Sequence, residues 1–347
     1  NGRDHCVNHP AEAVMPTAKA FIAAVAGSAG ALSGAWAARA WPERAVRFIL
    51  PLGSGSGADV AARLIAAKLS ARWGRLVMVE NRPGVDGFVA AALFTEGHDD
   101  HALLFGPASA FTAHPYRYEK LPYDERDLSP IARVSATLVT VCVPASLGVD
   151  SLSGLVAMAR AQPGKLGWAT ITGATDLIFA GFLKSAGLDM VKIPYEDTAK
   201  AVDDVAEGRL HVYHAALAIV RAQAQAGRVK IIAITASERA AALPDVPTVA
   251  ESGFPALTFD GLVGIYGRRE MPAGLRRRIA ADIRTALSDP AIVSGLTATG
   301  QLVAPGSGSE FAAAIDKQRA GVARVAKVLG LKPMTGRLAV AGGGELV

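Results

Sequence analysis

Short apolar runs alternate with longer segments of helical periodicity over most of the chain. In the first third, the expected elements are strand, helix, strand, helix and strand, over 46–50, 58–71, 76–79, 88–94 and 102–105. This order is typical of a parallel sheet with helices packed on its faces.

The same alternation resumes at residue 138. The expected strands cover 138–144, 166–170, 190–193, 210–214, 229–235 and 257–264. The expected helices cover 152–161, 177–186, 199–207, 216–226, 272–287 and 310–329. The pattern predicts two α/β halves, and a crevice between two such halves is a usual place for a small ligand.

The two ends of the chain have a different character. Residues 20–38 carry no charge, follow Lys19 and precede the small-residue triplet Ala38-Arg39-Ala40. This is the order of a secretory signal, and the run is short for a transmembrane helix. We therefore assign 1–40 to a signal peptide with an upstream extension and expect a periplasmic protein. The glycine-rich end, 334–347, is expected to be disordered.

Composition narrows the possible classes of protein. The length of 347 residues suits two domains, and 51% apolar with 19% charged residues excludes a disordered chain. The net charge of +5 comes from scattered basic residues, so no nucleic acid is expected as a partner. Cys142 lies in an apolar run and is expected to be buried in a strand. Neither Cys6 nor the scattered histidines form a ligand pattern, so we expect no metal and no cofactor.

The loop after the first strand is the most informative local feature. Gly53-Ser-Gly-Ser-Gly57 lets a ligand approach the backbone, and the helix that follows presents free N–H groups and a positive dipole end. Such a loop suits a carboxylate or a phosphate. Asp59 falls in the first helical turn, where it either contacts the ligand or serves the helix start. The sequence leaves both roles open.

A second loop, Thr170–Asp176, also lies between an expected strand and an expected helix. Thr172, Thr175 and Asp176 are residue types that cap helices, and capping alone is one interpretation. The other is ligand binding, because this loop would face the first loop across the crevice.

Two enzyme classes are alternatives to a binding protein. The run Gly53–Ala58 fits G-x-G-x-x-A and Glu80 closes the next strand, as in NAD-dependent oxidoreductases. The export signal and Pro51 argue against that class. A hydrolase is disfavoured because no G-x-S-x-G elbow occurs and Ser109 has no marked histidine or acidic partner. We expect a protein that is not an enzyme.

Several segments then match a known family. Val79-Glu-Asn-Arg-Pro-Gly84 and Leu243-Pro-Asp-Val-Pro-Thr-Val249 are the most specific of them, and Lys120-Leu-Pro-Tyr-Asp124 lies between them. From Trp41 to Pro333, the chain resembles the exported substrate-binding proteins of tripartite tricarboxylate transporters, the Bug or TctC-like family.

The resemblance implies an α/β architecture, the type II periplasmic binding protein fold. Two α/β domains would be joined by two crossing strands near 141–144 and 256–259 and would close on a ligand. Domain 1 would be discontinuous, and the implied ranges are 41–143 with 257–333 for domain 1 and 144–256 for domain 2.

The resemblance also implies a function. A monomer would capture a small organic acid, amino acid or amide and deliver it to a membrane permease of the tripartite tricarboxylate type. Presentation of the ligand to a sensor is the alternative. Three loops would hold the ligand, chiefly through backbone N–H groups and hydroxyls. The implied ligand-binding residues are Leu52, Ser54, Gly55, Ser56, Asp59, Pro107, Ala108, Ser109, Thr172, Gly173, Ala174, Thr175, Asp176, Tyr195, Thr198 and Ala215.

The chain departs from the family pattern mainly in charge. Asp176 stands where the family often has histidine, and Glu196 and Asp197 replace a lysine and a glycine. A buried carboxylate beside a bound carboxylate is unfavourable unless a cation intervenes. We therefore hypothesise that the ligand is not a simple tricarboxylate. In the alternative, Glu196 and Asp197 point to solvent.

Overall fold

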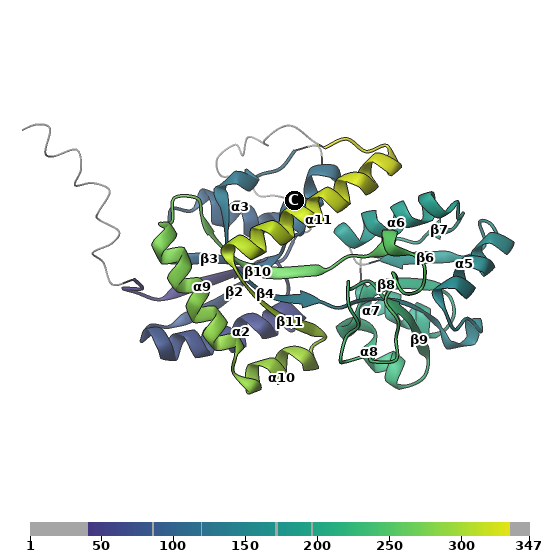
Figure 1. Cartoon of the computed structure of the whole chain (residues 1–347), viewed down its shortest axis with the longest axis horizontal. Helices are drawn as coiled ribbons and strands as arrows, with labels where there is room; N and C mark the ends of the chain where they lie inside the picture. The colour runs from purple at the N-terminus through teal and green to yellow at the C-terminus, as the bar shows by residue number, and fades with distance from the viewer. Residues whose placement is uncertain (1–40, 85–86, 119, 171–172, 196, 334–347) are drawn as a thin grey trace, which may run out of the picture. The chain divides into compact units, whose positions relative to one another are not determined.

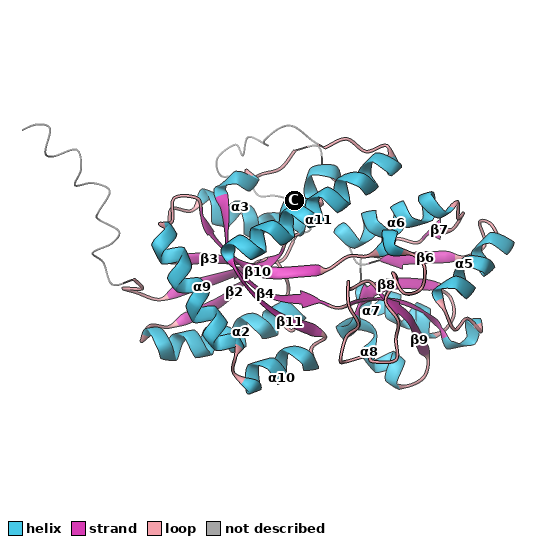
Figure 2. Ribbon diagram, in the orientation of Figure 1, coloured by secondary structure: helices cyan, strands magenta, loops and turns pink. Residues whose placement is uncertain are grey.

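The computed structural model describes residues 41–84, 87–118, 120–170, 173–195 and 197–333. The assigned signal segment, the assigned disordered end, Thr172 and Glu196 lie outside the described residues. The described residues from 44 onward form one compact unit. It contains two mixed sheets and the helices that cover them (Figures 1 and 2).

The first sheet has six strands in the order β11-β4-β10-β3-β1-β2. β1 is parallel to both β2 and β3, whereas β10 is antiparallel to β3 and β4. The parallel part is the strand-helix alternation that the sequence predicts. The strands are β1 (Val46–Leu50), β2 (Val77–Asn81), β3 (Ala102–Pro107), β4 (Leu128–Thr137), β10 (Gly261–Arg268) and β11 (Gln301–Ser307).

The helices of the first sheet begin and end at recognisable residues. The Ser56 hydroxyl accepts from the Asp59 amide at the start of α2, and Gly74 ends that helix in the left-handed region. Ser307 and Glu310 form a capping box at the start of α11. These helices are α2 (Gly57–Trp73), α3 (Phe88–Glu96), α4 (Ser109–Thr112), α9 (Ala273–Leu287), α10 (Pro290–Ala298) and α11 (Gly308–Leu329).

The second sheet has five strands in the order β7-β6-β8-β5-β9, with β5 antiparallel to both of its neighbours. Cys142 is fully buried on β5, as predicted, and burial raises the pKa of its thiol to about 12. The strands are β5 (Val139–Pro144), β6 (Gly167–Thr170), β7 (Val191–Lys192), β8 (Val212–Ala216) and β9 (Val229–Ile234). The helices are α5 (Leu152–Ala161), α6 (Ala174–Ala186), α7 (Thr198–Ala206) and α8 (Leu217–Gln225).

We call the two parts the first lobe and the second lobe, after their sheets. The chain passes from the first sheet to the second at Leu138, between β4 and β5. The Phe259 amide still donates to Thr235 O beside the second sheet. The chain therefore returns to the first sheet between Phe259 and Gly261, where β10 begins. The first passage, at Leu138, lies a few residues before the crossing predicted near 141–144, since β5 pairs with β8 and β9 of the second sheet.

The sequence analysis missed β4, α10 and β11 and placed β10 too early. β4 contains Pro130, which lacks an N–H and argues against an inner strand. The structure accommodates Pro130 beside Tyr266, where the register with β10 shifts. β11 contains Pro305 and Gly306, and its ladder with β4 is interrupted between Val303 and Gly306. As an edge strand, β11 tolerates that interruption.

Helix α11 packs on both lobes. Phe311 and Ile315, near its start, belong to the core of the first lobe, and Val322 belongs to the core of the second. Its last turns lie against α6 so closely that a Cβ atom on Gly181 would be 2.3 Å from Val325 Cγ1. In Figure 1, α11 (yellow) runs beside α6. This helix therefore ties the second lobe to the first.

Candidate functional site

The first predicted loop leaves the carboxyl end of β1 and is braced from within. The Asp59 carboxylate accepts from Gly55 N at 2.9 Å, from Arg63 Nε at 3.0 Å and from Asn81 Nδ2 at 2.9 Å. Asn81 also donates to Leu52 O at 2.9 Å. Gly55 has a φ of 85°, so the turn needs a residue that tolerates the left-handed region.

This geometry favours a supporting role for Asp59. Its side chain is buried, and burial by itself would raise its pKa, but the bonds from Arg63, Gly55 and Asn81 outweigh burial and lower the pKa. Its carboxylate oxygens accept hydrogen bonds from these three protein groups. Ser56 caps α2, whereas Ser54 and Gly55 are exposed. Of the predicted contacts in this loop, exposed Ser54 is available to a ligand, whereas the Gly55 amide and the Leu52 carbonyl already bond to Asp59 and Asn81.

The loop Pro107–Ser109 lies beside the first loop, because β3 and β1 are adjacent parallel strands. Gly106 packs so tightly that a Cβ atom there would be 2.8 Å from Pro51 Cγ. Ala108 is buried, and its amide donates to Leu262 O at 2.9 Å. Ser109 opens α4 and is partly exposed, which makes it the available side chain of this loop.

The loop before α6 belongs to the second lobe and faces Ser109. Gly173 is the N-cap residue, with φ 92° and ψ −143°, and no side chain caps α6. Among the predicted capping residues, Thr175 and Asp176 therefore lie inside the helix. A Cβ atom on Gly173 would lie 4.0 Å from Ser109 Cβ. The structure thus brings two of the three predicted loops together across the lobes.

Asp176 is paired with two cations. Arg117 Nη1 of the first lobe lies 2.9 Å from Asp176 Oδ2, and Lys192 Nζ on β7 lies 2.7 Å from Oδ1. Thr170 Oγ1 also donates to Oδ1, at 3.3 Å. Two positive charges therefore surround one negative charge. This removes the basis for our hypothesis that Asp176 disfavours a bound carboxylate, since that argument required an uncompensated charge.

Two other predicted contacts, Tyr195 and Ala215, are engaged elsewhere, and a third, Thr198, is exposed. Tyr195 Oη donates to Asp204 Oδ2 at 2.8 Å, which braces α7. Thr198 is exposed at the start of α7, and exposed Asp197 caps that helix, in line with the alternative that Asp197 points to solvent. Ala215 is fully buried in the core that β8 shares with α7. The structure therefore does not support a ligand contact by the side chain of Ala215.

The sequence analysis missed Arg117, Lys192 and Asn81. Asn81 lies in the segment 79–84, which resembles the family, and this is the local signal that could have drawn attention to it. Its contact with Asp59 is a tertiary contact, which the sequence does not show. Arg117 and Lys192 carry no local signal, because each is a single basic residue near a strand or a turn. Their role depends on a carboxylate that is distant in sequence.

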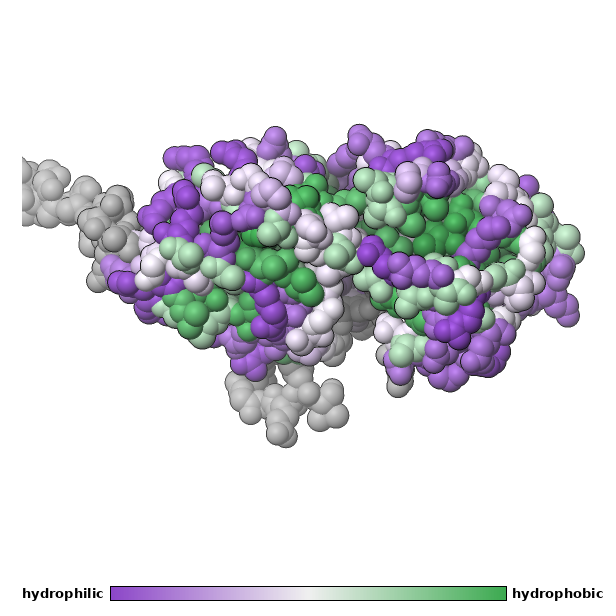
Figure 3. Space-filling model, turned by 90° about the horizontal axis from the view of Figure 1, so that it is seen from below, coloured by the Kyte–Doolittle hydropathy of each residue, from purple (hydrophilic) through white to green (hydrophobic). Residues whose placement is uncertain are grey.

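A cavity of about 720 Å³ lies elsewhere, among α8, β9, the 242–243 segment and α10. It is lined mainly by apolar residues such as Leu217, Ile231 and Leu243, and none of the predicted ligand residues lines it. α8 and α10 lie at the bottom of Figure 1, and Figure 3, seen from below, shows hydrophobic surface (green) among hydrophilic residues (purple). We base the site on the converging loops, because this cavity offers few polar groups to orient a ligand.

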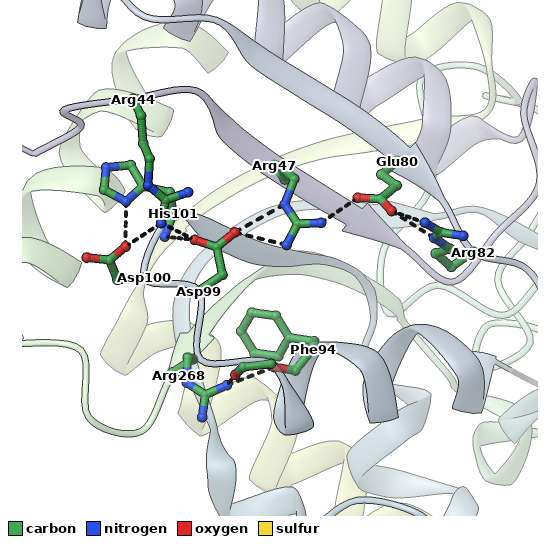
Figure 4. Close-up of polar contacts among 10 residues, drawn as sticks. Arg44, Arg47, Glu80, Arg82, Phe94, Asp99, Asp100, His101 and Arg268 are labelled. Carbon is green, nitrogen blue, oxygen red and sulfur yellow. Dashed lines mark hydrogen bonds and ion pairs between the residues drawn. The ribbon is translucent and has the colours of Figure 1, made fainter. Parts of the chain in front are cut away.

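Asp99, Asp100 and His101 form a cluster with metal-ligand atoms. Arg44 and Arg47 already pair with Asp99, and Arg47 continues to Glu80, as Figure 4 shows. Burial would raise the pKa of Asp99, but the hydrogen bonds from Arg44, His101 N and Arg47 lower it to about 2. These neighbours make the cluster an ion-pair network on the first lobe.

None of the helices in the described ranges is both long and apolar enough to cross a membrane.

Two α/β lobes that are joined by crossing segments, with small-residue loops and an uncapped helix start facing each other, define a solute-binding protein of the periplasmic type. The comparisons agree with this class. A structure described as a periplasmic transporter has a TM-score of 0.74 and 28% identity, and the match covers 84% of this chain and 99% of that one. Rpa4515 of R. palustris, solved with adipate, has a TM-score of 0.75 and 26% identity, with coverage of 85% and 100%.

The sequence comparisons identify the family. The model of the "Tripartite tricarboxylate transporter family receptor" matches residues 61–331. A UPF0065 protein of Bordetella bronchiseptica is 30% identical over 298 residues, which cover 85% of this chain and 89% of that protein. The chain belongs to the tripartite tricarboxylate transporter receptor family, whose members are periplasmic solute-binding proteins.

Proposed function

We propose that this chain is an extracytoplasmic solute-binding protein that captures a small dicarboxylate between its lobes and delivers it to a tripartite tricarboxylate-type permease. It acts as an exported monomer and performs no chemistry on the ligand. The observation that carries the proposal is the apposition of Ser109 and Gly173, with two cations around Asp176 beside them.

The start of α6 is the group best suited to a carboxylate. The N–H groups of the first turn of a helix have no intrahelical partners, and the N-cap residue of α6, Gly173, has no side chain to cap them. The positive dipole end adds about 0.3–1 kcal/mol for an anion at an exposed site. Arg117 and Lys192 both pair with the Asp176 carboxylate in the first turn, and either cation alone offsets its single negative charge.

The first loop and Ser109 supply the contacts from the other lobe. Ser54 of the first loop is exposed, and the bonds from Gly55 N to Asp59 and from Asn81 to Leu52 O hold that loop in place. Because only a closed arrangement contacts the ligand from both lobes, binding favours closure. The relative Rpa4515 was solved with adipate, which supports a dicarboxylate as the class of ligand.

Binding is tested by isothermal titration calorimetry with adipate, citrate and the neutral analogue adipamide. We expect saturable binding of adipate and none of adipamide, because the start of α6 favours a charged carboxylate. Equal binding of adipamide would overturn the proposed carboxylate site. No binding of any carboxylate in a wider panel would overturn the proposed ligand class.

Gly173→Ala is expected to weaken adipate binding by tenfold or more. The φ and ψ of Gly173 lie in a region that other residues adopt only at a cost of about 1–3 kcal/mol, so the start of α6 must move. Gly148→Ala is the control, since Gly148 also has a positive φ but nothing within 4 Å of an added Cβ. Equal affinities of the two variants, measured by the same titration, would contradict this role of Gly173.

A further inference from the structure

Arg117 projects from a rigid part of the first lobe. It follows the 3-10 turn η3 (His114–Tyr116). Tyr123 Oη donates to Ala110 O at 2.5 Å and lies 2.8 Å from His114 Nδ1. Phe88 packs edge-on against His114, with ring centroids 4.6 Å apart. These contacts fix the backbone that carries Arg117.

The guanidinium of Arg117 makes two contacts with the second lobe. Nη1 donates to Asp176 Oδ2 at 2.9 Å and to Gly173 O at 3.3 Å. The side chains of Arg117 and Asp176 are 20% and 15% exposed. In the part of the chain that the structure describes, no other ion pair has both partners at or below one fifth exposure. Solvent therefore screens this pair less than the surface pairs.

We propose that Arg117 is a positioning residue for ligand binding: it holds the start of α6 against the first lobe and so sets the geometry at which the two lobes meet the ligand. This inference rests on the proposed function. A planar trans peptide points its N–H opposite to its carbonyl. By holding Gly173 O, Arg117 therefore also fixes the direction of the Ala174 N–H, the first of α6.

The arrangement around Asp176 separates this role from simple charge pairing. Lys192 belongs to the second lobe, as Asp176 does, and its side chain is 52% exposed. When Arg117 is replaced, Lys192 still pairs with Asp176, whereas the bonds of Arg117 to Asp176 and Gly173 O, which connect the lobes, are lost. Lys192→Ala is therefore the matched control, because it removes a cation from the same carboxylate without affecting that connection.

The first test is adipate affinity by calorimetry. We expect Arg117→Ala to weaken binding by tenfold or more and Lys192→Ala by less than threefold. Arg117→Lys keeps the charge but loses the planar donors, so an intermediate affinity is expected. Arg117→Lys also tests the proposal if Arg117→Ala fails to fold. In a double-mutant cycle with Asp176→Asn, the two effects should be non-additive. Arg117→Ala and Arg117→Lys affinities both within threefold of the wild type would overturn the proposal.

The second test needs no ligand, so it also applies if the proposed ligand class is wrong. Spin labels at Glu96→Cys on α3 and Lys184→Cys on α6 report the distance between the lobes, with Cys6 replaced by serine; both sites are exposed and Cys142 is buried. We expect a broader or longer distance distribution for Arg117→Ala and no change for Lys192→Ala. If the wild type binds no carboxylate and Arg117→Ala leaves the distribution unchanged, the proposal fails together with the proposed function. If the wild type binds no carboxylate but Arg117→Ala still changes the distance distribution, the result supports the positioning role of Arg117 and not the proposed ligand class.

Discussion

At the scale of single residues, His214 is the clearest source of pH dependence. It is fully buried on β8 and stacks on Phe179, with ring centroids 5.3 Å apart. Neither imidazole nitrogen has a hydrogen bond of ordinary geometry to a described residue. Burial lowers the pKa of His214 from 6.5 to about 4, and the Thr175 backbone and the Asp176 charge oppose this only in part.

The sign of the effect follows from which state binds the proton. Between pH 6.5 and pH 4, the unfolded chain protonates His214 and the folded chain does not, so the free energy of unfolding falls with falling pH. From pH 7.5 to pH 5, the loss is about 2 kcal/mol at 1.36 kcal/mol per unit below 6.5. Urea unfolding of His214→Leu should lack this loss, and exposed His98→Asn should keep it. An unchanged pH dependence in His214→Leu would contradict the assignment.

At the scale of elements, the contact of α6 with α11 depends on Gly181. A Cβ atom there would lie 2.3 Å from Val325 Cγ1, so Gly181→Ala should overpack the interface and cost about 1–3 kcal/mol in urea unfolding. Val325→Ala in the same chain should restore much of that loss. Gly321→Ala is the control: it lies in α11 with only Arg324 Nη2 near, and should stabilise by up to about 1 kcal/mol. A neutral Gly181→Ala would show that the helices can separate freely.

At the scale of the whole molecule, the two lobes should unfold together. α11 contributes Phe311 to the core of the first lobe and Val322 to that of the second, so neither core survives the loss of this helix intact. Trp73 reports on the first lobe through its bond to Asp282, and Trp168 reports on the second through its bond to Met190 O.

Variants that retain only Trp73 or only Trp168 allow the two lobes to be followed separately. Fluorescence in urea should give coincident midpoints for the two variants, as a two-state transition requires. Two separate midpoints, in variants whose total stabilities match by circular dichroism, would show that the lobes fold as independent domains.

Local pattern alone was sufficient for most of the regular elements. β1, α5 and the helix at α9 follow from apolar runs and periodicity that the backbone geometry imposes within a few residues. The Gly/Ser loop after β1 was recognisable because its small residues and its position before a helix are local features. The family resemblance rests on the order of segments such as 79–84 and 243–249, which the family match bears out.

The rest depends on residues that meet only in the folded chain. Pro130 argues against a strand locally, yet β4 is an inner strand because β10 and β11 pair with it on both sides. The geometry favours a supporting role for Asp59, because Asn81, from another strand, donates to it. The sequence predicts that Asp176 disfavours a bound carboxylate unless a cation intervenes, and Arg117, 59 positions earlier, is such a cation. The free energy of a charge or a strand depends on its spatial neighbours, and folding brings those neighbours from distant parts of the sequence.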